Sequence, residues 1–232
     1  MATPEIPLTR AGMASIIDHT LLNPEATPDA VARLCDEAST LGVKAVCVSA
    51  ARLPLPPGRL AEGIAVAAVV GFPSGAHPPL VKAAEAAAVV ALGATEVDVV
   101  IDLGRAMAGE WGSVAAELRQ VRSAVGPAVV VKAILETAVL GRGPEGRDRI
   151  AAACRAAEEG GADFVKTSTG FHPAGGATLD AVRLMAATVA GRLGVKAAGG
   201  IRTAEAALSM VTAGATRIGA SSSAAILAGL EG

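Results

Sequence analysis

Four ionisable side chains interrupt segments of this sequence that otherwise have the apolar character of buried strands. The residues are Asp98 within EVDVVI, Lys132 within VVVKAIL, Lys166 at the end of ADFVK and Lys196 within GVKAAGG. Burying ammonium groups is costly unless they are paired with carboxylates or one of them loses its proton. Desolvation and a cationic neighbour both lower the pKa of a lysine, and a neutral lysine can attack a carbonyl group to form a Schiff base. The cluster therefore indicates covalent catalysis by an amine.

A structural explanation of the same residues also exists. In that case they form an ion cluster, or they stand at strand ends where solvent begins, as we expect of Lys44. A single lysine in a strand is more often structural than catalytic, but four interruptions on consecutive strands favour catalysis. Asp98 and Lys166 each follow a helix-ending glycine, Gly93 or Gly161, by five residues. We therefore expect their side chains at similar depths.

The elements that carry these residues repeat one joint, in which an Ala-rich segment ends at glycine and an apolar run follows. Examples are LGVKAVCVS, LGATEVDVV, GGADFVKTS and AGATRIGAS. A glycine that ends a helix in the left-handed conformation, followed by a short buried strand, explains this joint. We predict strands over residues 15–18, 45–49, 65–70, 96–101, 128–135, 163–167, 195–198 and 216–219. We predict helices over residues 28–41, 51–61, 78–92, 113–125, 145–159, 179–190, 203–213 and 222–230.

Strands that alternate with helices are expected to run parallel. Eight such units within 232 residues predict an α/β protein with a closed (β/α)8 TIM barrel, as a single domain over residues 1–232. Barrel enzymes keep their chemistry at the carboxyl ends of the strands. TSTG, GGIR and GASSS follow the last three predicted strands and offer backbone N–H groups, hydroxyls and helix starts. One such turn indicates little, whereas three on these loops predict a phosphate site.

Composition argues against several other classes of function. The chain has 20 Lys and Arg against 22 Asp and Glu, no basic run and only 2% aromatic residues, so nucleic-acid binding is not expected. Apolar runs stop short of the roughly 18 residues that span a bilayer, and MATPEIPLTRAGM lacks a secretory signal, so we expect a cytoplasmic protein without membrane contact. Cys35, Cys47 and Cys154 are expected to be reduced core thiols. The three histidines are scattered, so no metal site is expected.

In order and spacing, several segments resemble the deoxyribose-phosphate aldolase family along nearly the whole chain. They are IDHTLL (17–22), VCVS (46–49), VVGFPSG (69–75), GATEVDVVI (93–101), VKAILE (131–136), ADFVKTSTGF (162–171), VKAAGGIRT (195–203) and GASS (219–222). The resemblance implies a TIM-barrel aldolase that uses neither a metal nor an organic cofactor. Its partner would be a small phosphorylated sugar, and a homodimer is a hypothesis for its assembly.

The same resemblance implies roles for individual residues. Lys166 would be the Schiff-base lysine, with Asp98 and Lys196 as the proton-transfer network. Substrate contacts are implied for Asp18, Thr20, Cys47, Lys132 and Thr169, and phosphate contacts for Gly170, Gly200, Ser221 and Ser222. A small core residue explains Cys47 about equally well. The chain contains no tyrosine, so it departs from those members whose C-terminal tyrosine approaches the active site.

The implied reaction is reversible cleavage of 2-deoxy-D-ribose 5-phosphate to acetaldehyde and D-glyceraldehyde 3-phosphate. Two alternatives remain open. One is a Schiff-base aldolase for another sugar phosphate, which the same lysine and loops would also suit. The other is a catalytically silent protein that binds sugar phosphates, and the presence of Asp98, Lys166 and Lys196 together argues against it.

Overall fold

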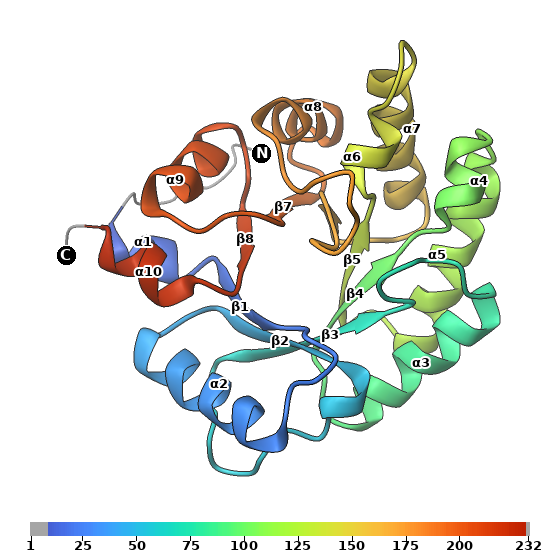
Figure 1. Ribbon diagram of the computed structural model, residues 1–232. Coiled ribbons are helices and arrows are strands. Elements are labelled where there is room, and N and C mark those ends of the chain that lie inside the picture. Colours follow the sequence, from blue (N-terminus) through green and yellow to red (C-terminus); the bar gives the residue numbers. More distant parts are fainter. Residues whose placement is uncertain (1–8, 231–232) are drawn as a thin grey trace.

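The computed structural model describes residues 9–230 of the chain. Within this range eight parallel strands close into a barrel, each pairing with the next along the sequence and β8 pairing with β1 (Figure 1). The strands are β1 (Ile17–Leu21), β2 (Ala45–Ser49), β3 (Ala65–Val70), β4 (Glu96–Val100), β5 (Val130–Ile134), β6 (Phe164–Lys166), β7 (Gly194–Ala198) and β8 (Arg217–Ala220). The predicted TIM barrel is confirmed, and each predicted strand overlaps an observed one.

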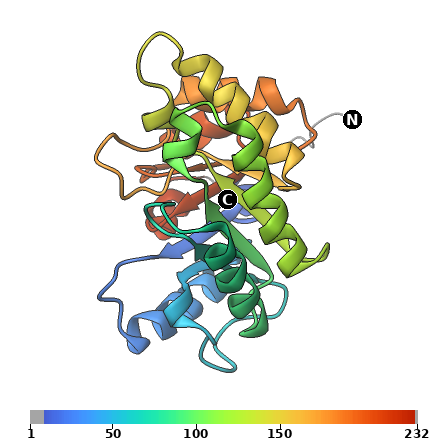
Figure 2. The same ribbon diagram turned by 90° about the vertical axis from the view of Figure 1, so that its right-hand side faces the viewer.

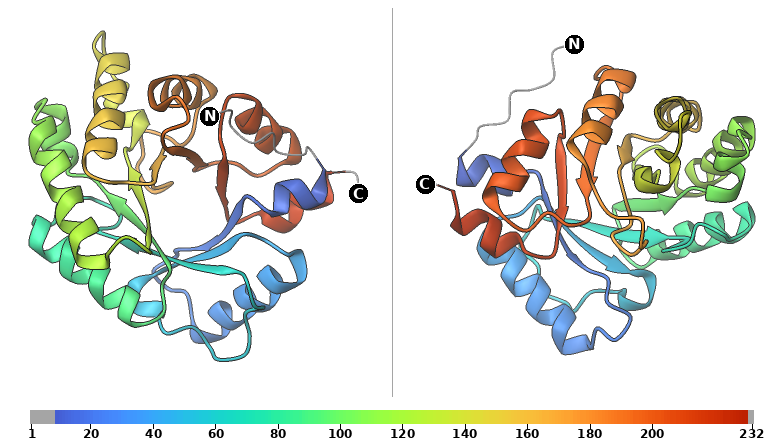
Figure 3. Two further views of the ribbon diagram at one scale, coloured as in Figure 1. Left: turned by 180° about the vertical axis from the view of Figure 1, so that it is seen from behind. Right: turned by 45° about the horizontal axis from the view of Figure 1, so that its top comes forward.

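Helices surround the barrel, and views from both sides show them around the strands (Figures 1 and 3). The longer ones are α2 (Pro28–Leu41), α3 (Pro79–Ala91), α5 (Trp111–Val125), α7 (Gly146–Glu159), α8 (Leu179–Val189) and α9 (Ala204–Thr212), followed by the short α10 (Ser223–Ala228). In residues 9–230 no helix has both the length and the apolar character needed to cross a membrane. A side view shows the loops after β1 and β6 projecting from the same end of the barrel (Figure 2).

Helix α2 shows how local sequence sets these boundaries. The Thr27 side chain accepts a hydrogen bond from the amide of Ala30, and Pro28 occupies the first turn, where its missing N–H costs nothing. The helix ends at Gly42, whose φ of 64° is the left-handed conformation that glycine adopts without strain. The predicted span 28–41 is therefore correct at both ends.

One predicted helix is wrong and three short ones were not foreseen. The segment 51–61 contains only the end of a single 3-10 turn, Ala50–Arg52, because prolines at 54, 56 and 57 remove the backbone donors that a helix needs. The additional helices are α1 (Arg10–Ala14), α4 (Leu103–Met107) and α6 (Thr137–Leu140). Each has four or five residues, too few to produce a recognisable helical period in the sequence.

The strand register places the inward-facing side chains in three layers of four, each drawn from alternate strands. The floor layer is Ala45, Glu96, Phe164 and Arg217. The middle layer is Asp18, Ala67, Lys132 and Lys196. The top layer is Cys47, Asp98, Lys166 and Gly219. Barrel interiors are ordinarily filled by branched apolar residues, so charged residues at seven of these twelve positions indicate a function.

The main apolar core lies outside the barrel, between the strands and the helices. Outward-facing Val46, Val97 and Val165 belong to the same buried cluster as Leu118 of α5 and Met185 of α8. A second, smaller cluster consists of Leu22, Cys47, Ala67 and Val69. Because Cys47, Ala67 and Val69 come from β2 and β3, the interior is apolar on that side and charged on the remainder.

Candidate active site

Asp98 is the point at which the three predicted lysines converge. Its Oδ1 accepts a hydrogen bond from Lys132 Nζ at 2.7 Å. Its Oδ2 accepts from Lys166 Nζ at 2.7 Å and from Lys196 Nζ at 2.7 Å. Strands β4 and β6 hold Asp98 and Lys166 in the same layer, which confirms that the two residues reach similar depths. The four charges singled out in the sequence therefore form one contiguous cluster.

Asp18 extends this cluster across the barrel to β1. Its Oδ2 accepts a hydrogen bond from Lys196, and its Oδ1 accepts from Arg217 Nη1 at 2.8 Å. Lys132 Nζ lies 3.6 Å from Asp18 Oδ2. Asp18 is fully buried. The Asp18 carboxylate is thus fully engaged by cationic side chains of the barrel interior.

Glu96 and Arg217 complete the network from the barrel floor, and the sequence reasoning missed both. Arg217 Nη2 lies 3.3 Å from Glu96 Oε1, and Lys132 Nζ lies 2.6 Å from Glu96 Oε2. The alternation of strand side chains could have revealed them. Glu96 lies two residues before Asp98 on the same strand face, and Arg217 lies two before the inward-facing Gly219.

The network divides the lysines into two protonation classes. Burial alone would lower the pKa of Lys196, but Asp18 and Asp98 outweigh that effect and raise it. Burial is likewise outweighed by carboxylates at Lys132, whose pKa is raised. At Lys166 burial dominates, Lys196 adds repulsion, and contact with Asp98 does not compensate, so its pKa is lowered. Lys166 is therefore the lysine of this cluster that most readily becomes a neutral nucleophile.

The carboxylates remain ionised despite their burial. Desolvation raises the pKa of Asp98, but the three lysines around it more than offset this and hold it well below the ordinary value. The same balance lowers the pKa of Asp18 to about 2, with Lys196 as the largest favourable charge. At neutral pH both side chains are thus hydrogen-bond acceptors.

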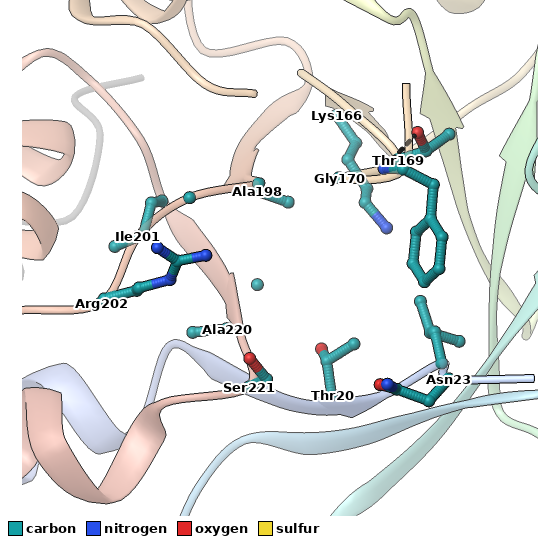
Figure 4. Close-up of a pocket in the computed structure, with 15 residues that line it drawn as sticks. Thr20, Asn23, Lys166, Thr169, Gly170, Ala198, Ile201, Arg202, Ala220 and Ser221 are labelled. Atoms are coloured by element: carbon teal, nitrogen blue, oxygen red, sulfur yellow. Dashed lines mark hydrogen bonds between the residues drawn. The ribbon is translucent and has the colours of Figure 1, made fainter. Parts of the chain in front are cut away.

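Lys166 opens into a cavity of about 230 Å³ at the carboxyl ends of the strands. In Figure 4 the Lys166 side chain extends toward the cavity, with Thr20 and Ser221 on the opposite side. The lining residues are Thr20, Leu22, Asn23, Lys166, Thr169, Gly170, Phe171, Ala198, Gly199, Gly200, Ile201, Arg202, Gly219, Ala220 and Ser221. Six residues proposed from the sequence are among them, namely Thr20, Lys166, Thr169, Gly170, Gly200 and Ser221. This cavity is the candidate substrate site.

The loops after β6 and β7 form one end of the cavity by close backbone packing. Gly170 and Gly200 have positive φ angles of 82° and 85°, which glycine adopts without strain. A Cβ on Gly176 would lie 2.2 Å from the backbone oxygen of Gly199. Arg202 also lines this end, where it adds a positive charge to the exposed backbone. These features suit a phosphate group.

Comparison with known proteins agrees with this geometry. A family profile described as DeoC/LacD family aldolase matches residues 13–231. The chain belongs to the DeoC/LacD aldolase family. Among curated relatives, the deoxyribose-phosphate aldolase of Kocuria rhizophila is 57% identical over 97% of this chain and 99% of that protein. The deoxyribose-phosphate aldolase of Nocardia farcinica is 57% identical over 99% of both.

Several solved structures that are similar to this chain are also aldolases. QR15, an aldolase, is 37% identical with a TM-score of 0.85, covering 93% of this chain and 94% of that one. A putative deoxyribose-phosphate aldolase from Coccidioides immitis is 35% identical with a TM-score of 0.88, covering 98% and 87%. The tetrameric deoxyribose phosphate aldolase from Aeropyrum pernix is 33% identical with a TM-score of 0.81, covering 95% and 91%.

The structure separates the predicted site residues of the aldolase into two groups. Asp18, Cys47, Asp98, Lys132 and Lys196 do not line the cavity and lie fully buried in the barrel. They lie beside and beneath Lys166, so they would act on a substrate in the cavity only through the Lys166 amine or a water molecule. The thiol of Cys47 has its pKa raised by burial and by Asp98, which suits a core residue.

Ser222 and Arg202 differ from the sequence-based assignment at the end of the cavity where phosphate binding was predicted. Ser221 lines the cavity, whereas its neighbour Ser222 does not and stands at the start of α10. Arg202 was not singled out, although GGIR was recognised as a phosphate loop. The sequence signal that could have indicated Arg202 is its position shortly after Gly199 and Gly200.

Glu136 is a further residue that sequence reasoning missed. It follows β5, has a φ of 53° and is fully buried. Its Oε2 accepts hydrogen bonds from the amide of Thr169 at 3.2 Å and from the Thr169 hydroxyl at 2.5 Å. Glu136 therefore fixes the loop that follows Lys166.

Proposed function

We propose that this aldolase reversibly cleaves 2-deoxy-D-ribose 5-phosphate to acetaldehyde and D-glyceraldehyde 3-phosphate through a Schiff base on Lys166. One observation carries the assignment. Of the three barrel lysines, Lys166 is the one that lines the cavity and the one whose pKa is lowered. A buried amine that loses its proton more readily than its neighbours and faces the cavity is the nucleophile that such a reaction needs.

The chemistry follows from this arrangement. Neutral Lys166 attacks the aldehyde carbon of the open-chain sugar, and loss of water leaves a protonated imine, the iminium. Asp98, acting through water or Lys196, accepts the proton of the C3 hydroxyl. The C2–C3 bond then breaks, its electrons pass into the iminium to form an enamine, and glyceraldehyde 3-phosphate leaves. Protonation of the enamine carbon and hydrolysis release acetaldehyde and restore Lys166, so the expected mechanism uses no metal or organic cofactor.

Substrate identity rests on the other end of the cavity. Glycine-rich loops, Arg202 and Ser221 together suit a phosphate, while Thr20 lies across the cavity from Lys166 where sugar hydroxyls would be. The proteins named deoxyribose-phosphate aldolase that match nearly the full chain support this substrate. We propose further that the chain acts as one domain, in the cytoplasm, where its three buried free cysteines would stay reduced.

Reductive trapping tests the proposal. Borohydride added with acetaldehyde should inactivate the enzyme and leave an N-ethyl group on the peptide that contains Lys166, as mass spectrometry would detect. Borohydride without acetaldehyde is the control. An adduct confined to Lys132 or Lys196 would overturn the assignment. Absence of both an adduct and aldolase activity would favour the silent binding protein, and faster cleavage of a different sugar phosphate would favour the other aldolase.

A further inference from the structure

We propose that Glu96 and Arg217, on the barrel floor, are positioning residues for this reaction, which set the number of charges beneath Lys166 and so weaken the hold of its amine on a proton. The inference rests on the proposed function, because it concerns the nucleophile of that mechanism. Neither residue lines the cavity, and both are at least nine-tenths buried. Any effect on the reaction must therefore pass through the charged network.

Arg217 connects the two lower layers of the barrel. Its guanidinium joins Asp18 at 2.8 Å to Glu96 at 3.3 Å and lies over the ring of Phe164, 5.3 Å from its centroid. Phe164 in turn packs so closely on Gly194 that a Cβ there would be 2.1 Å from the ring. The floor is thus filled by this ring and the ion pair.

Counting charges explains why the interior favours the loss of one lysine proton. Within the three interior layers the cations are Lys132, Lys166, Lys196 and Arg217, and the carboxylates are Asp18, Glu96 and Asp98. Four positive and three negative charges leave an excess of one when all are ionised. The excess disappears when one lysine loses its proton. An uncompensated charge in a buried site is costly, so the interior favours the balanced state.

Contacts with carboxylates decide which lysine loses its proton. Lys132 lies within 4 Å of Glu96, Asp98 and Asp18. Lys196 contacts Asp18 and Asp98, whereas Lys166 contacts Asp98 alone among the described residues. The other titratable neighbours of Lys166 are Lys196, whose positive charge repels a proton on Lys166, and Cys47, whose thiol has its pKa raised by burial. Lys166 therefore holds its proton least strongly, and Glu96 contributes by engaging Lys132.

Variants of the two floor residues should move the reaction in opposite directions. Arg217→Met removes one cation, so the interior balances with Lys166 protonated. The acidic limb of kcat/KM against pH should then move to higher pH by about one unit or more, a loss of about tenfold on that limb. Glu96→Gln removes one carboxylate and should move the limb to lower pH. The double variant restores the balance and should return the limb toward its original position.

Two controls separate charge from structure. Arg217→Lys keeps the positive charge but loses the planar guanidinium group. The acidic limb of its kcat/KM profile should therefore stay near that of the wild type. Glu117→Gln removes a buried carboxylate outside the barrel, where it pairs with Lys82 at 2.9 Å between α3 and α5. Glu117 is about as buried as Glu96, but its removal leaves the number of charges inside the barrel unchanged. The acidic limb of the Glu117→Gln profile should therefore not move.

The experiment measures kcat/KM for 2-deoxyribose 5-phosphate across about pH 5 to 10 in each variant that gives a cooperative thermal unfolding transition. Opposite shifts in the two single variants support the inference. Shifts of the same sign, or none, overturn it. If Arg217→Met does not fold, the sign of the Glu96→Gln shift decides alone. Borohydride trapping at Lys166 in the wild type distinguishes the two hypotheses, because a failure there rejects the proposed function instead.

Discussion

Thr169, which lines the cavity, also shapes it through contacts within the protein. Its hydroxyl donates to Glu136 Oε2 at 2.5 Å and accepts from the amide of Phe171 at 3.1 Å. The backbone of Glu136 is in the left-handed conformation. This conformation costs free energy in a non-glycine residue and persists where surrounding contacts enforce it. The Thr169 side chain therefore orders the turn at Gly170, whose backbone lines the cavity.

Ser221 provides a test of the phosphate end at the scale of one residue. Ser221→Asp places a carboxylate where the 5-phosphate is proposed to bind, so like charges would oppose each other. We expect kcat/KM for 2-deoxyribose 5-phosphate to fall about tenfold to a hundredfold, corresponding to roughly 1.5–3 kcal/mol. Unphosphorylated 2-deoxyribose makes no such contact, so its turnover should hardly change.

A matched control for Ser221→Asp is Ser123→Asp on the exposed surface of α5. It adds the same charge away from the cavity and should affect neither substrate. Equal losses on both substrates in Ser221→Asp would place the phosphate elsewhere. They would mean that this serine supports the loop instead of contacting the ligand.

At the scale of elements, the cavity depends on two loops that touch through their backbones. The loop from β6 to α8 contributes Gly176, and the loop from β7 to α9 contributes Gly199, whose φ is 95°. Side chains between them would hold the loops apart, since a Cβ on Gly176 would reach 2.2 Å from the Gly199 oxygen. The positions of these two loops, which are proposed to bind phosphate, are therefore set jointly.

Gly176→Ala tests this contact between the loops. The added methyl group should destabilise the protein by about 1–3 kcal/mol, as overpacking does, and should raise KM for the phosphorylated substrate more than it lowers kcat. Urea unfolding and steady-state kinetics measure the two effects.

Gly112→Ala is the matched control, because nothing lies within 4 Å of its Cβ and it sits in α5. It should be neutral or stabilising by up to about 1 kcal/mol. Unchanged stability and KM in Gly176→Ala would show that the loops are not so tightly coupled.

At the scale of the whole molecule, the sequence indicated the barrel more completely than it indicated the network inside. Strands 45–49 and 65–70 were predicted at both ends because glycine joints and β-branched runs are local signals. Lys132 and Asp98 were recognisable because a charge within an apolar run is also local. Glu96 and Arg217 stand at strand starts, where a charge looks ordinary. Glu96 and Arg217 come into contact because β8 closes on β1, which brings strands that are distant in the sequence together at the barrel floor.

Closure also makes the stability of the whole barrel depend on pH, because the pKa values of the interior aspartates are depressed only in the folded state. A carboxyl group whose folded pKa is depressed contributes stability above its ordinary pKa and loses that contribution as pH falls through the folded value. For Asp18 the ordinary value is 3.8 and the folded value about 2, a difference equivalent to about 2 kcal/mol. The folded pKa of Asp98 is also depressed, so it acts in the same direction.

We therefore expect the urea midpoint to fall most steeply between about pH 4 and 2. Repulsion among surface cations would also destabilise the protein in acid, but salt screens exposed charges far more than buried ones. Repeating the titration at roughly 0.05 and 0.5 M NaCl separates the two causes. A loss of stability that persists at high salt belongs to the barrel interior. A midpoint that stays level to about pH 2.5, or a loss that salt abolishes, would mean that Asp18 and Asp98 do not hold the barrel together as ionised groups.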